Sequence, residues 1–415
     1  EHEPITDLVL AKVSSSELAT FNLLNSETSA DTQYLTNIWD GLLEVNNYGE
    51  LVPCIAEEWS TEDGGLTWTF NLRDNATWVD VNGNEMAQVT AQDFLTGMEW
   101  VLNFYKNDSA NTSMPMEMIA GAEEYYEYTK GLTQEEAYAL DASEGSVFRE
   151  MVNIETPDDY TLVYHCTTEK PYFDTVCAYT CMYPLAQGLV DELGIDGIKS
   201  MNNENMWYNG CYTMTSYIQG NEKVFTKNPA YWDTECTRFD TVTIRMVEST
   251  DVAYQLYQSG EIDEVSLTES NVMTISGDES NPYHDQMVEW PADFRSYQFH
   301  LNYNKLNEDG TPDTNWNTAA ANEAFRLSWY YGLDLTPYYS RTNAVNPLSC
   351  ENNYYSMPGL LYTSDGTDYT DLVKAELGLG EADGEKMIRL NSELGEQYKQ
   401  QAIEELTALG VTFPV

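Results

Sequence analysis

The chain has 415 residues, of which 42% are hydrophobic and 13% aromatic, so it can fill the cores of two or three domains and is not disordered. Asp and Glu number 69 against 19 Lys and Arg, which gives a formal net charge of −50. Such a surface repels phosphate backbones and anionic lipid headgroups, and it therefore excludes nucleic acids and membrane surfaces as electrostatic partners.

The N-terminal stretch, EHEPITDLVLAKV, lacks the charged and then apolar pattern of a secretory leader. No apolar run in the chain approaches the roughly 20 residues that a membrane-spanning helix needs. Two interpretations stay open at this point: a cytoplasmic protein, or an exported protein whose leader has been removed.

A strand followed by a helix is the first clear pattern. Over residues 66–72, apolar and polar residues alternate, which is the period of a half-buried strand. The turn that follows, at Arg73 and Asp74, is expected to be structural. Thr90 is a candidate N-cap, and Asp93 stands three places on, as in a capping box. The apolar stripe of the predicted helix comprises Phe94, Met98, Val101, Leu102 and Tyr105.

The middle of the chain adds a second strand and another helix. Alternation over residues 239–247 predicts the strand, and Ser249 or Thr250 can cap a helix that stops at Gly260. The predicted apolar face of this helix comprises Val252, Leu256 and Tyr257. An extended pattern resumes in EIDEV, residues 261–265, so we expect a strand, helix, strand unit.

The last predicted helix, residues 392–410, has one apolar face and a C-terminal Gly410 suited to its cap. That face comprises Tyr398, Ala402, Leu406 and Leu409. Phe325 and Trp329 are expected in the core of an earlier helix. After Gly410 the sequence VTFPV has the character of a further element. Strands and helices interleave throughout, which favours mixed α/β lobes joined by short crossings.

Catalytic and metal-binding motifs are missing from the sequence. It contains no G-x-S-x-G elbow, no G-x-x-x-x-G-K-[ST] phosphate loop and no H-E-x-x-H. His300, one of four His, has no second His at metal-binding spacing. Residues 307–315 and 364–368 cluster oxygen ligands around Gly but lack the twelve-residue calcium loop, so turns are expected. The sequence therefore predicts no cofactor and no metal.

The cysteines leave the redox compartment open. Seven scattered Cys, an odd number, are too few for a disulfide scaffold. Cys177 and Cys181 would share one helix face if CAYTC is helical. Core or reduced thiols are favoured over a zinc site, because four ligands at zinc spacing are absent.

Aromatic residues are crowded into two intervals of the chain. Most of them are expected to pack in cores or on the surface, but such side chains also suit a cleft that grips varied ligands. The two groups are Trp207, Tyr208, Tyr212, Tyr217, Tyr231 and Trp232, and then Tyr330, Tyr331, Tyr338 and Tyr339.

Short motifs recur in a fixed order along the whole chain. The first block contains IWDGLLEV, LVPCIAEEW, GGLTWTFNLRD and TAQDF, between residues 38 and 94. The later motifs are WYNGCYTMTSYIQGNEKVFTKNPAYWD (207–233), AYQLYQSGEIDEV (253–265), YQFHLNYN (297–304) and NEAFRLSWYYGLD (322–334). This series resembles the extracytoplasmic solute-binding proteins of family 5, the dipeptide and oligopeptide binders of ABC importers, from about residue 8 to 410. Cys211, in place of a Pro, and Trp39-Asp40, in place of an aromatic residue and Glu, depart from the family pattern.

The resemblance implies an α/β, two-lobed periplasmic-binding-protein-like fold of the cluster C type. Lobe I would comprise residues 1–38 and 165–247, with residues 39–164 as an extra subdomain. Residues 248–415 would form lobe II, which is expected to be incomplete because the family's C-terminal part has no counterpart in the sequence. The strand at 66–72 is then scaffold, beside the ligand-binding lobes.

Ligand contacts are also implied by the resemblance. SSELATFNL occupies the place of the family's S-x-E-P-x-T-L-D-P loop, where Glu17 would oppose a ligand ammonium group or else be a solvated loop carboxylate. Arg295 would meet a ligand carboxylate, because its guanidinium fork matches that geometry. The full set of expected contacts is Ser16, Glu17, Leu18, Thr20, Tyr212, Phe294, Arg295 and Tyr297.

The resemblance implies a binding protein and not an enzyme. It would capture peptides outside the cytoplasmic membrane by hinge closure and deliver them to an ABC permease, as a monomer anchored by lipid at the cell surface or in the periplasm. One alternative is an oligosaccharide or a nickel complex bound on the same fold. A secreted acidic hydrolase is the other, and it requires a pair of carboxylates facing one cleft.

Overall fold

The computed structural model describes residues 5–13, 15, 17–107, 111–235, 237–289, 296–351, 355–356, 361–376 and 389–415. By internal contacts the chain divides into two compact units, Glu1–Ser266 (unit 1) and Leu267–Val415 (unit 2). The predicted lobe boundary between residues 247 and 248 stays a prediction.

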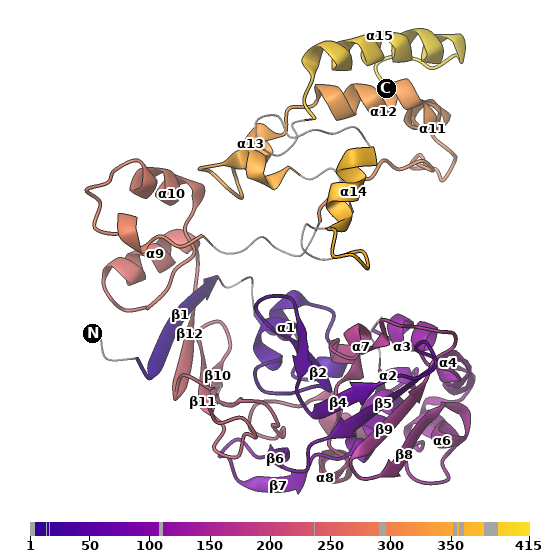
Figure 1. The fold of residues 1–415 in the computed structure, drawn as a ribbon, viewed down its shortest axis with the longest axis vertical. Helices are drawn as coiled ribbons and strands as arrows, with labels where there is room; N and C mark the ends of the chain where they lie inside the picture. Colours follow the sequence, from indigo (N-terminus) through magenta and orange to yellow (C-terminus); the bar gives the residue numbers. More distant parts are fainter. Residues whose placement is uncertain are drawn as a thin grey trace. The chain divides into compact units, whose positions relative to one another are not determined.

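A four-stranded sheet joins the beginning and the end of unit 1 (Figure 1). Strand β1 is parallel to β12, with Leu10 opposite Ile244, and the other neighbours are antiparallel. The strand predicted at 239–247 is confirmed as β12. In sheet order the strands are β1 (Asp7–Val13), β12 (Thr241–Val247), β11 (Glu222–Lys227) and β10 (Tyr212–Ile218).

Helix α9 (Thr250–Gln258) covers one face of this sheet. Ser249 is its N-cap, as predicted, and accepts a hydrogen bond from the amide of Val252. Val252 itself is 37% exposed, so its predicted place on the apolar face is wrong, and the buried residue of the helix is Ala253. The extended segment after the helix meets β1 through one parallel bridge, between Leu10 and Glu264, and the structure assigns no strand there.

The other face of the sheet carries the segment between β1 and the subdomain. This segment contains a 3-10 turn, η2 (Leu23–Asn25), and helix α1 (Ser29–Leu35). The ring of Tyr34 on α1 stacks on that of Phe225 in β11, with ring centroids 6.4 Å apart. Strand β1 therefore has two covered faces, with Val9 and Ala11 toward α9 and Leu8, Leu10 and Lys12 toward α1.

A second sheet forms the centre of the region between residues 39 and 164. The strand predicted at 66–72 is confirmed as β5, in which Trp68, Phe70 and Leu72 are buried. Its antiparallel sheet has the order β4 (Ala56–Ser60), β5 (Thr67–Leu72), β9 (Thr161–His165) and β8 (Ile154–Asp158). Two smaller ribbons pair β2 (Leu43–Val45) with β3 (Leu51–Pro53) and β6 (Thr77–Val79) with β7 (Glu85–Gln88).

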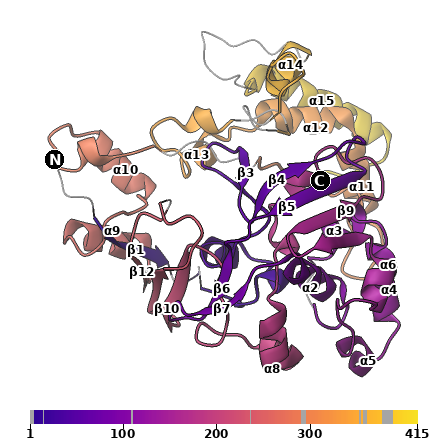
Figure 2. The same cartoon turned by 60° about the horizontal axis from the view of Figure 1, so that its bottom comes forward.

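Helix α2 (Ala91–Leu102) begins with the predicted capping box of Thr90 and Asp93. Its first-turn carboxylate also accepts hydrogen bonds from Trp78 and from the Gln187 amide, at 3.1 and 3.0 Å. The helix is buried nearly all round, beyond the single stripe expected, and Figure 2 shows the neighbouring helices beside the β4 to β8 sheet. These are α3 (Ser113–Met118), α4 (Ala122–Lys130), α5 (Gln134–Tyr138) and α6 (Val147–Met151).

A buried ion pair holds the end of α2. Lys106 Nζ lies 2.6 Å from Glu99 Oε2, and each side chain is 4% exposed. The other carboxylate oxygen of Glu99 accepts hydrogen bonds from Tyr125 and Asn103, at 2.8 and 2.9 Å. All of these partners lie between residues 39 and 164, the range predicted as an extra subdomain, within unit 1.

Three short elements lead from the subdomain back to β10. They are α7 (Phe173–Val176), η3 (Thr180–Met182) and α8 (Gln187–Lys199). Cys177 ends α7 and Cys181 lies in η3, so the two thiols do not share a single helix, although both are buried and unpaired by a disulfide.

Helices and turns make up the described part of unit 2. Helix α15 lies along α12 (Figure 1), where Gly332 and Gly395 face each other so closely that a Cβ on Gly395 would lie 2.6 Å from the Cα of Gly332. The elements are α10 (Glu269–Ser276), η4 (His284–Gln286), α11 (Thr314–Ala321), α12 (Glu323–Gly332), α13 (Thr336–Tyr339), η5 (Pro347–Cys350), α14 (Tyr369–Glu376) and α15 (Ser392–Ala408).

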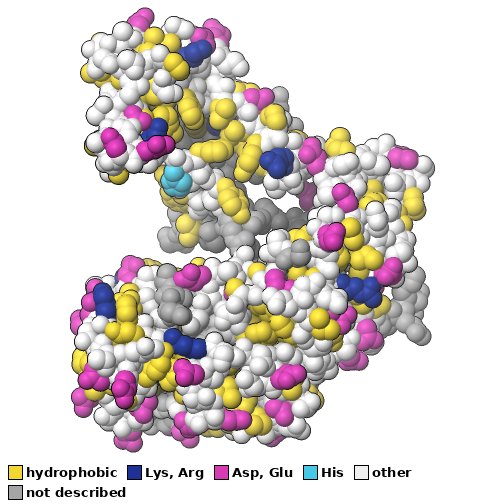
Figure 3. Space-filling view, turned by 180° about the vertical axis from the view of Figure 1, so that it is seen from behind, with side chains coloured by type: hydrophobic (Ala, Val, Ile, Leu, Met, Phe, Trp, Pro, Cys, Tyr) yellow, Lys and Arg dark blue, Asp and Glu magenta, His cyan; other side chains and the backbone are white. Residues whose placement is uncertain are grey.

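The helix predicted near the C-terminus is confirmed as α15, with Ala402 and Leu406 buried. Leu409 is 66% exposed and Trp329 is 47% exposed, so both predictions of core packing are wrong. The reason is that the buried cluster of the described unit 2 is small. It comprises Ala319, Ala324, Ala402, Leu406 and Val411, and other apolar side chains stay at the surface, where Figure 3 shows them in yellow among acidic groups.

Candidate ligand-binding site

The segment that follows β1, residues 17–20, is partly buried against the rest of unit 1. Leu18 is 8% exposed and belongs to the main core, whereas Ala19 is exposed and Thr20 half-buried. The Thr20 hydroxyl accepts a hydrogen bond from the Asn22 amide at 3.0 Å. Ser16 lies outside the described residues.

The Glu17 carboxylate faces a lysine of the same chain. Its Oε1 lies 2.6 Å from the Nζ of Lys223, a side chain that is 0% exposed. Desolvation raises the pKa of Glu17, but the ion pair with Lys223 and hydrogen bonds from the Gly220 and Leu18 amides outweigh it and hold the pKa below its usual value. Glu17 is therefore ionised at neutral pH and opposed by an internal ammonium group.

A cavity of about 380 Å³ lies between α1 and the β1-β12-β11-β10 sheet. Tyr212 is one of its walls, and the Tyr212 hydroxyl donates to the Phe239 carbonyl at 3.1 Å. The lining is largely apolar. Among its polar side chains, Lys12 donates a hydrogen bond from Nζ to Gln33 Oε1 at 3.2 Å. The lining residues are Leu8, Leu10, Lys12, Gln33, Tyr34, Asn37, Tyr212, Phe225, Phe239, Val242 and Ile244.

Tyr34 connects the cavity to the segment after β1. Its ring lines the cavity, and the Lys223 Nζ that pairs with Glu17 lies 5.4 Å from the centre of the same ring. Of the predicted contacts, Tyr212 lines the cavity, and Glu17 is linked to the cavity only through Lys223 and the Tyr34 ring.

The remaining predicted contacts belong to unit 2. Tyr297 is 79% exposed, and the nearby Phe299 packs on Tyr338 with ring centroids 6.1 Å apart. Phe294 and Arg295 lie outside the described residues. The ligand roles of all eight predicted residues stay predictions.

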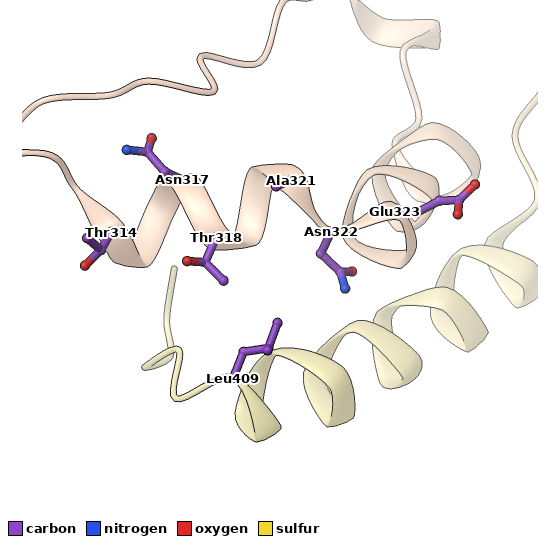
Figure 4. A pocket seen from close by; sticks show the side chains of 7 residues that line it. All are labelled: Thr314, Asn317, Thr318, Ala321, Asn322, Glu323 and Leu409. Carbon is purple, nitrogen blue, oxygen red and sulfur yellow. The ribbon is translucent and has the colours of Figure 1, made fainter.

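A broader depression of about 600 Å³ lies beside α11 in unit 2 (Figure 4). Thr318 and Asn322 point toward Leu409 at the end of α15, while Asn317 points away. The Asn322 amide is already used, because it donates to Glu405 Oε2 at 2.7 Å and accepts from the Phe325 amide at 2.8 Å. The depression is thus an open seam between helices, in which the side chain of Asn322 is already engaged by partners of its own unit.

Buried carboxyl groups elsewhere in unit 1 have structural partners. Desolvation raises the pKa of Asp40 to about 6, although Trp232 donates a hydrogen bond to it at 3.0 Å. The guanidinium of Arg73 stacks on the same Trp232 ring, 3.5 Å from its centre, and Arg73 Nε donates to the Cys54 carbonyl at 2.6 Å. Arg73 is therefore structural, as expected, and neither of the two cavities is lined by a pair of carboxyl groups.

The described residues contain neither a metal-binding cluster nor a membrane-spanning helix. There, no group of three or more His, Cys, Asp or Glu side chains is placed to hold a metal ion. No described helix combines the length and the apolar character required to span a bilayer.

Lys223 and Tyr34 were missed by sequence reasoning. Successive side chains of β11 point to opposite faces of the sheet, so Lys223 shares the inward, buried face with Phe225. The partner of this inward lysine could not be predicted from the strand alone, because Glu17 reaches it only when the segment after β1 lies against the β10–β11 hairpin. The role of Tyr34 could not be found in this way, because it depends on how α1 crosses the sheet.

Comparison with known proteins gives matches along most of the chain. A sequence model of the family described as bacterial extracellular solute-binding proteins, family 5 Middle, matches residues 50–384. The oligopeptide-binding protein SarA of Streptococcus gordonii is 26% identical over 364 residues, covering 86% of this chain and 52% of SarA. The oligopeptide-binding protein AliA of Streptococcus pneumoniae is 26% identical over 412 residues, covering 95% of this chain and 59% of AliA.

A solved structure supports the fold. Listeria monocytogenes OppA bound to peptide has a TM-score of 0.63 at 18% identity, and the match covers 99% of this chain and 70% of that protein. The predicted α/β, two-lobed periplasmic-binding-protein fold is thereby confirmed. The chain spans about half to three fifths of the length of the curated relatives it matches.

Proposed function

Because the chain belongs to the bacterial extracellular solute-binding proteins of family 5, we propose that it is the substrate-binding component of an ABC importer and captures peptides. The observation that carries this proposal is the family match over residues 50–384, together with relatives that are named as oligopeptide-binding proteins. The work of such a protein is binding and release, without covalent chemistry, so the proposal includes that it is not an enzyme.

The proposed mechanism is a population shift. Ligand binds one conformation of a two-lobed protein better than the other and favours closure about the hinge, and the closed protein then docks on a membrane permease. The proposed location is outside the cytoplasmic membrane, with a lipid anchor in the mature form and a monomeric state. The strongly acidic composition supports the absence of nucleic acid from the set of partners.

The eight predicted contacts belong to this proposal. Tyr212 contributes a wall of the cavity, Leu18 anchors the segment after β1 in the core while Thr20 stays half-buried, and Tyr297 offers an exposed ring for peptide side chains. The exposed aromatic side chains of unit 2 are the feature that supports varied peptide side chains as ligands. An oligosaccharide or a nickel complex remains the alternative ligand on this fold.

The test is mass spectrometry of the small molecules that denaturation releases from the purified full-length protein. Short peptides in the released fraction are the expected result. Intact sugars or a nickel complex would redirect the ligand class while leaving a binding protein. If incubation with added peptides yields shorter products at a steady rate, the protein is a hydrolase and the proposal is wrong.

A further inference from the structure

The β10–β11 hairpin grips the segment after β1 at one carboxylate. Tyr217 in β10 donates its hydroxyl to Glu17 Oε1 at 3.1 Å, and the Gly220 amide in the hairpin turn donates to Oε2 at 2.7 Å. Lys223 in β11 completes the set at 2.6 Å from Oε1. Gly220 has a φ of +68°, a left-handed conformation that glycine adopts without strain, so the turn itself aims an amide at the carboxylate.

A second carboxylate fixes the other end of the same segment. Asp31 in α1 is 0% exposed, and it accepts hydrogen bonds from the Ala19 amide at 2.7 Å and from the Ser26 hydroxyl at 3.0 Å. Leu18, between these anchors, is packed in the core. Residues 17–20 are therefore held at both ends, with Ala19 and part of Thr20 left facing outward.

The buried ammonium of Lys223 is the cation among the groups that hold the Glu17 carboxylate. Besides Glu17, it faces the rings of Tyr217 and Tyr34, whose centres lie 5.2 and 5.4 Å from Nζ. A fully desolvated lysine is retained in a fold only where a carboxylate and other favourable groups surround it. A lysine at this position therefore specifies where Glu17, and with it the segment 17–20, must lie.

We propose that Lys223 is a positioning residue for ligand capture: its ion pair with Glu17 holds residues 17–20 in the conformation that meets the ligand. This inference rests on the proposed function. It also assigns Glu17 a structural role, since the ammonium group that opposes its carboxylate belongs to Lys223. Residues 17–20 then offer the ligand the exposed Ala19 and the outward part of the half-buried Thr20.

The chain contains a matched control for the loss of a buried ion pair. Lys106 and Glu99 are also 2.6 Å apart and also buried, but their partners lie in the subdomain. Lys106→Met leaves the buried carboxylate of Glu99 without its cation, and Lys223→Met does the same to Glu17, whose side chain is 18% exposed, so both variants are expected to lower the melting temperature. A purely structural role for Lys223 predicts that both variants affect ligand binding alike.

The experiment measures binding of a synthetic random-sequence octapeptide mixture to the full-length protein by equilibrium dialysis, with mass spectrometric readout. Lys223→Met is expected to raise the apparent Kd at least tenfold, whereas Lys106→Met stays within about twofold of the wild type. The double variant Glu17→Gln, Lys223→Met removes both charges, so it is expected to recover melting temperature without recovering affinity.

Distinct outcomes separate this inference from the proposed function. If the wild type binds the mixture and Lys223→Met binds it equally well, Lys223 does not position the site. The same conclusion follows if affinity returns together with melting temperature in the double variant, or if Lys106→Met loses as much affinity. If the wild type itself binds no peptide, the proposed function is wrong, and this inference is lost with it.

Discussion

Unit 1 and unit 2 use the same kinds of side chain in opposite ways. In unit 1, large aromatic residues such as Trp39, Trp78 and Trp100 are at most 1% exposed. In the described part of unit 2, the buried cluster consists largely of alanines, while Tyr297, Phe299 and other rings remain exposed. Aromatic residues in unit 1 thus stabilise its fold, and those in unit 2 are available for contacts beyond their own unit.

The sharpest test of this comparison is the loss of one phenylalanine from each unit. Phe70 is 0% exposed at the centre of the β4-β5-β9-β8 sheet, so Phe70→Ala is expected to lower the free energy of unfolding by about 3–5 kcal/mol. Phe299 is 71% exposed, and Phe299→Ala is expected to change it by less than about 0.5 kcal/mol. Denaturant titration measures both, and equal effects would abolish the contrast between the units.

The buried ion pair of the subdomain gives the next largest effect. Lys106→Met is expected to cost about 3 kcal/mol, because Glu99 keeps a buried charge without its cation. The control is Lys130→Met on the exposed face of α4, where the partner Glu127 is 57% exposed, and its cost is expected to be far smaller because solvent screens the pair. A small effect at Lys106 would show that the interior of unit 1 admits water to the remaining carboxylate.

Two buried acids of unit 1, Asp40 and Asp93, have raised pKa values, whereas Asp309 in unit 2 has a lowered one. Desolvation raises the pKa of both Asp40 and Asp93 to about 6. Since these values exceed those of the unfolded chain, their contribution to stability is fully present below about pH 4 and is lost as the pH rises through about 6. Each carboxyl group accounts for about 3 kcal/mol over this window, from a shift of about two pKa units.

Asp40→Asn is expected to flatten this decline, as measured by denaturant unfolding between pH 4 and 7. The matched control is Asp309→Asn in unit 2. There, hydrogen bonds from Thr311 to an exposed carboxylate lower its pKa, so that group contributes nothing to the decline. A decline that persists unchanged in Asp40→Asn would mean that this carboxyl is ionised in the fold at all of these pH values.

The smallest effect concerns the exposed rings of unit 2. Tyr297→Ala is expected to weaken peptide binding about fivefold without changing the melting temperature, because the ring is exposed and gives contact area at little cost in side-chain entropy. Tyr48, 84% exposed in unit 1, supplies the control, and Tyr48→Ala is expected to leave affinity unchanged. Calorimetric titration with one peptide compares the two, and equal losses would remove the special role assigned to Tyr297.

Local elements could be predicted from the sequence because local rules produce them. The alternation at 67–72, the capping box of Thr90 and Asp93 and the Ser249 cap each depend on residues a few positions apart. The same rules did not predict burial in unit 2. Trp329 and Leu409 have helical spacing suited to a core, but the described neighbours do not cover them. Helical periodicity identifies an apolar face, and only tertiary packing decides what lies against it.

In the candidate site, too, local features could be predicted and long-range partners could not. The resemblance located the segment after β1, but it assigned Glu17 to a ligand ammonium group or to solvent. The actual partner, Lys223, is 206 residues away along the chain and becomes visible only when β11 is placed beside β10 and β12. Long-range pairs of this kind depend on sheet order, which alternation within one strand does not encode.

Calorimetric titration of the full-length protein with a peptide recovered from it tests the central claim most directly. The account predicts a saturable, one-to-one binding heat, with the peptide recovered afterwards at its original mass. The absence of any binding heat, or recovery of the peptide as shorter fragments, would contradict it.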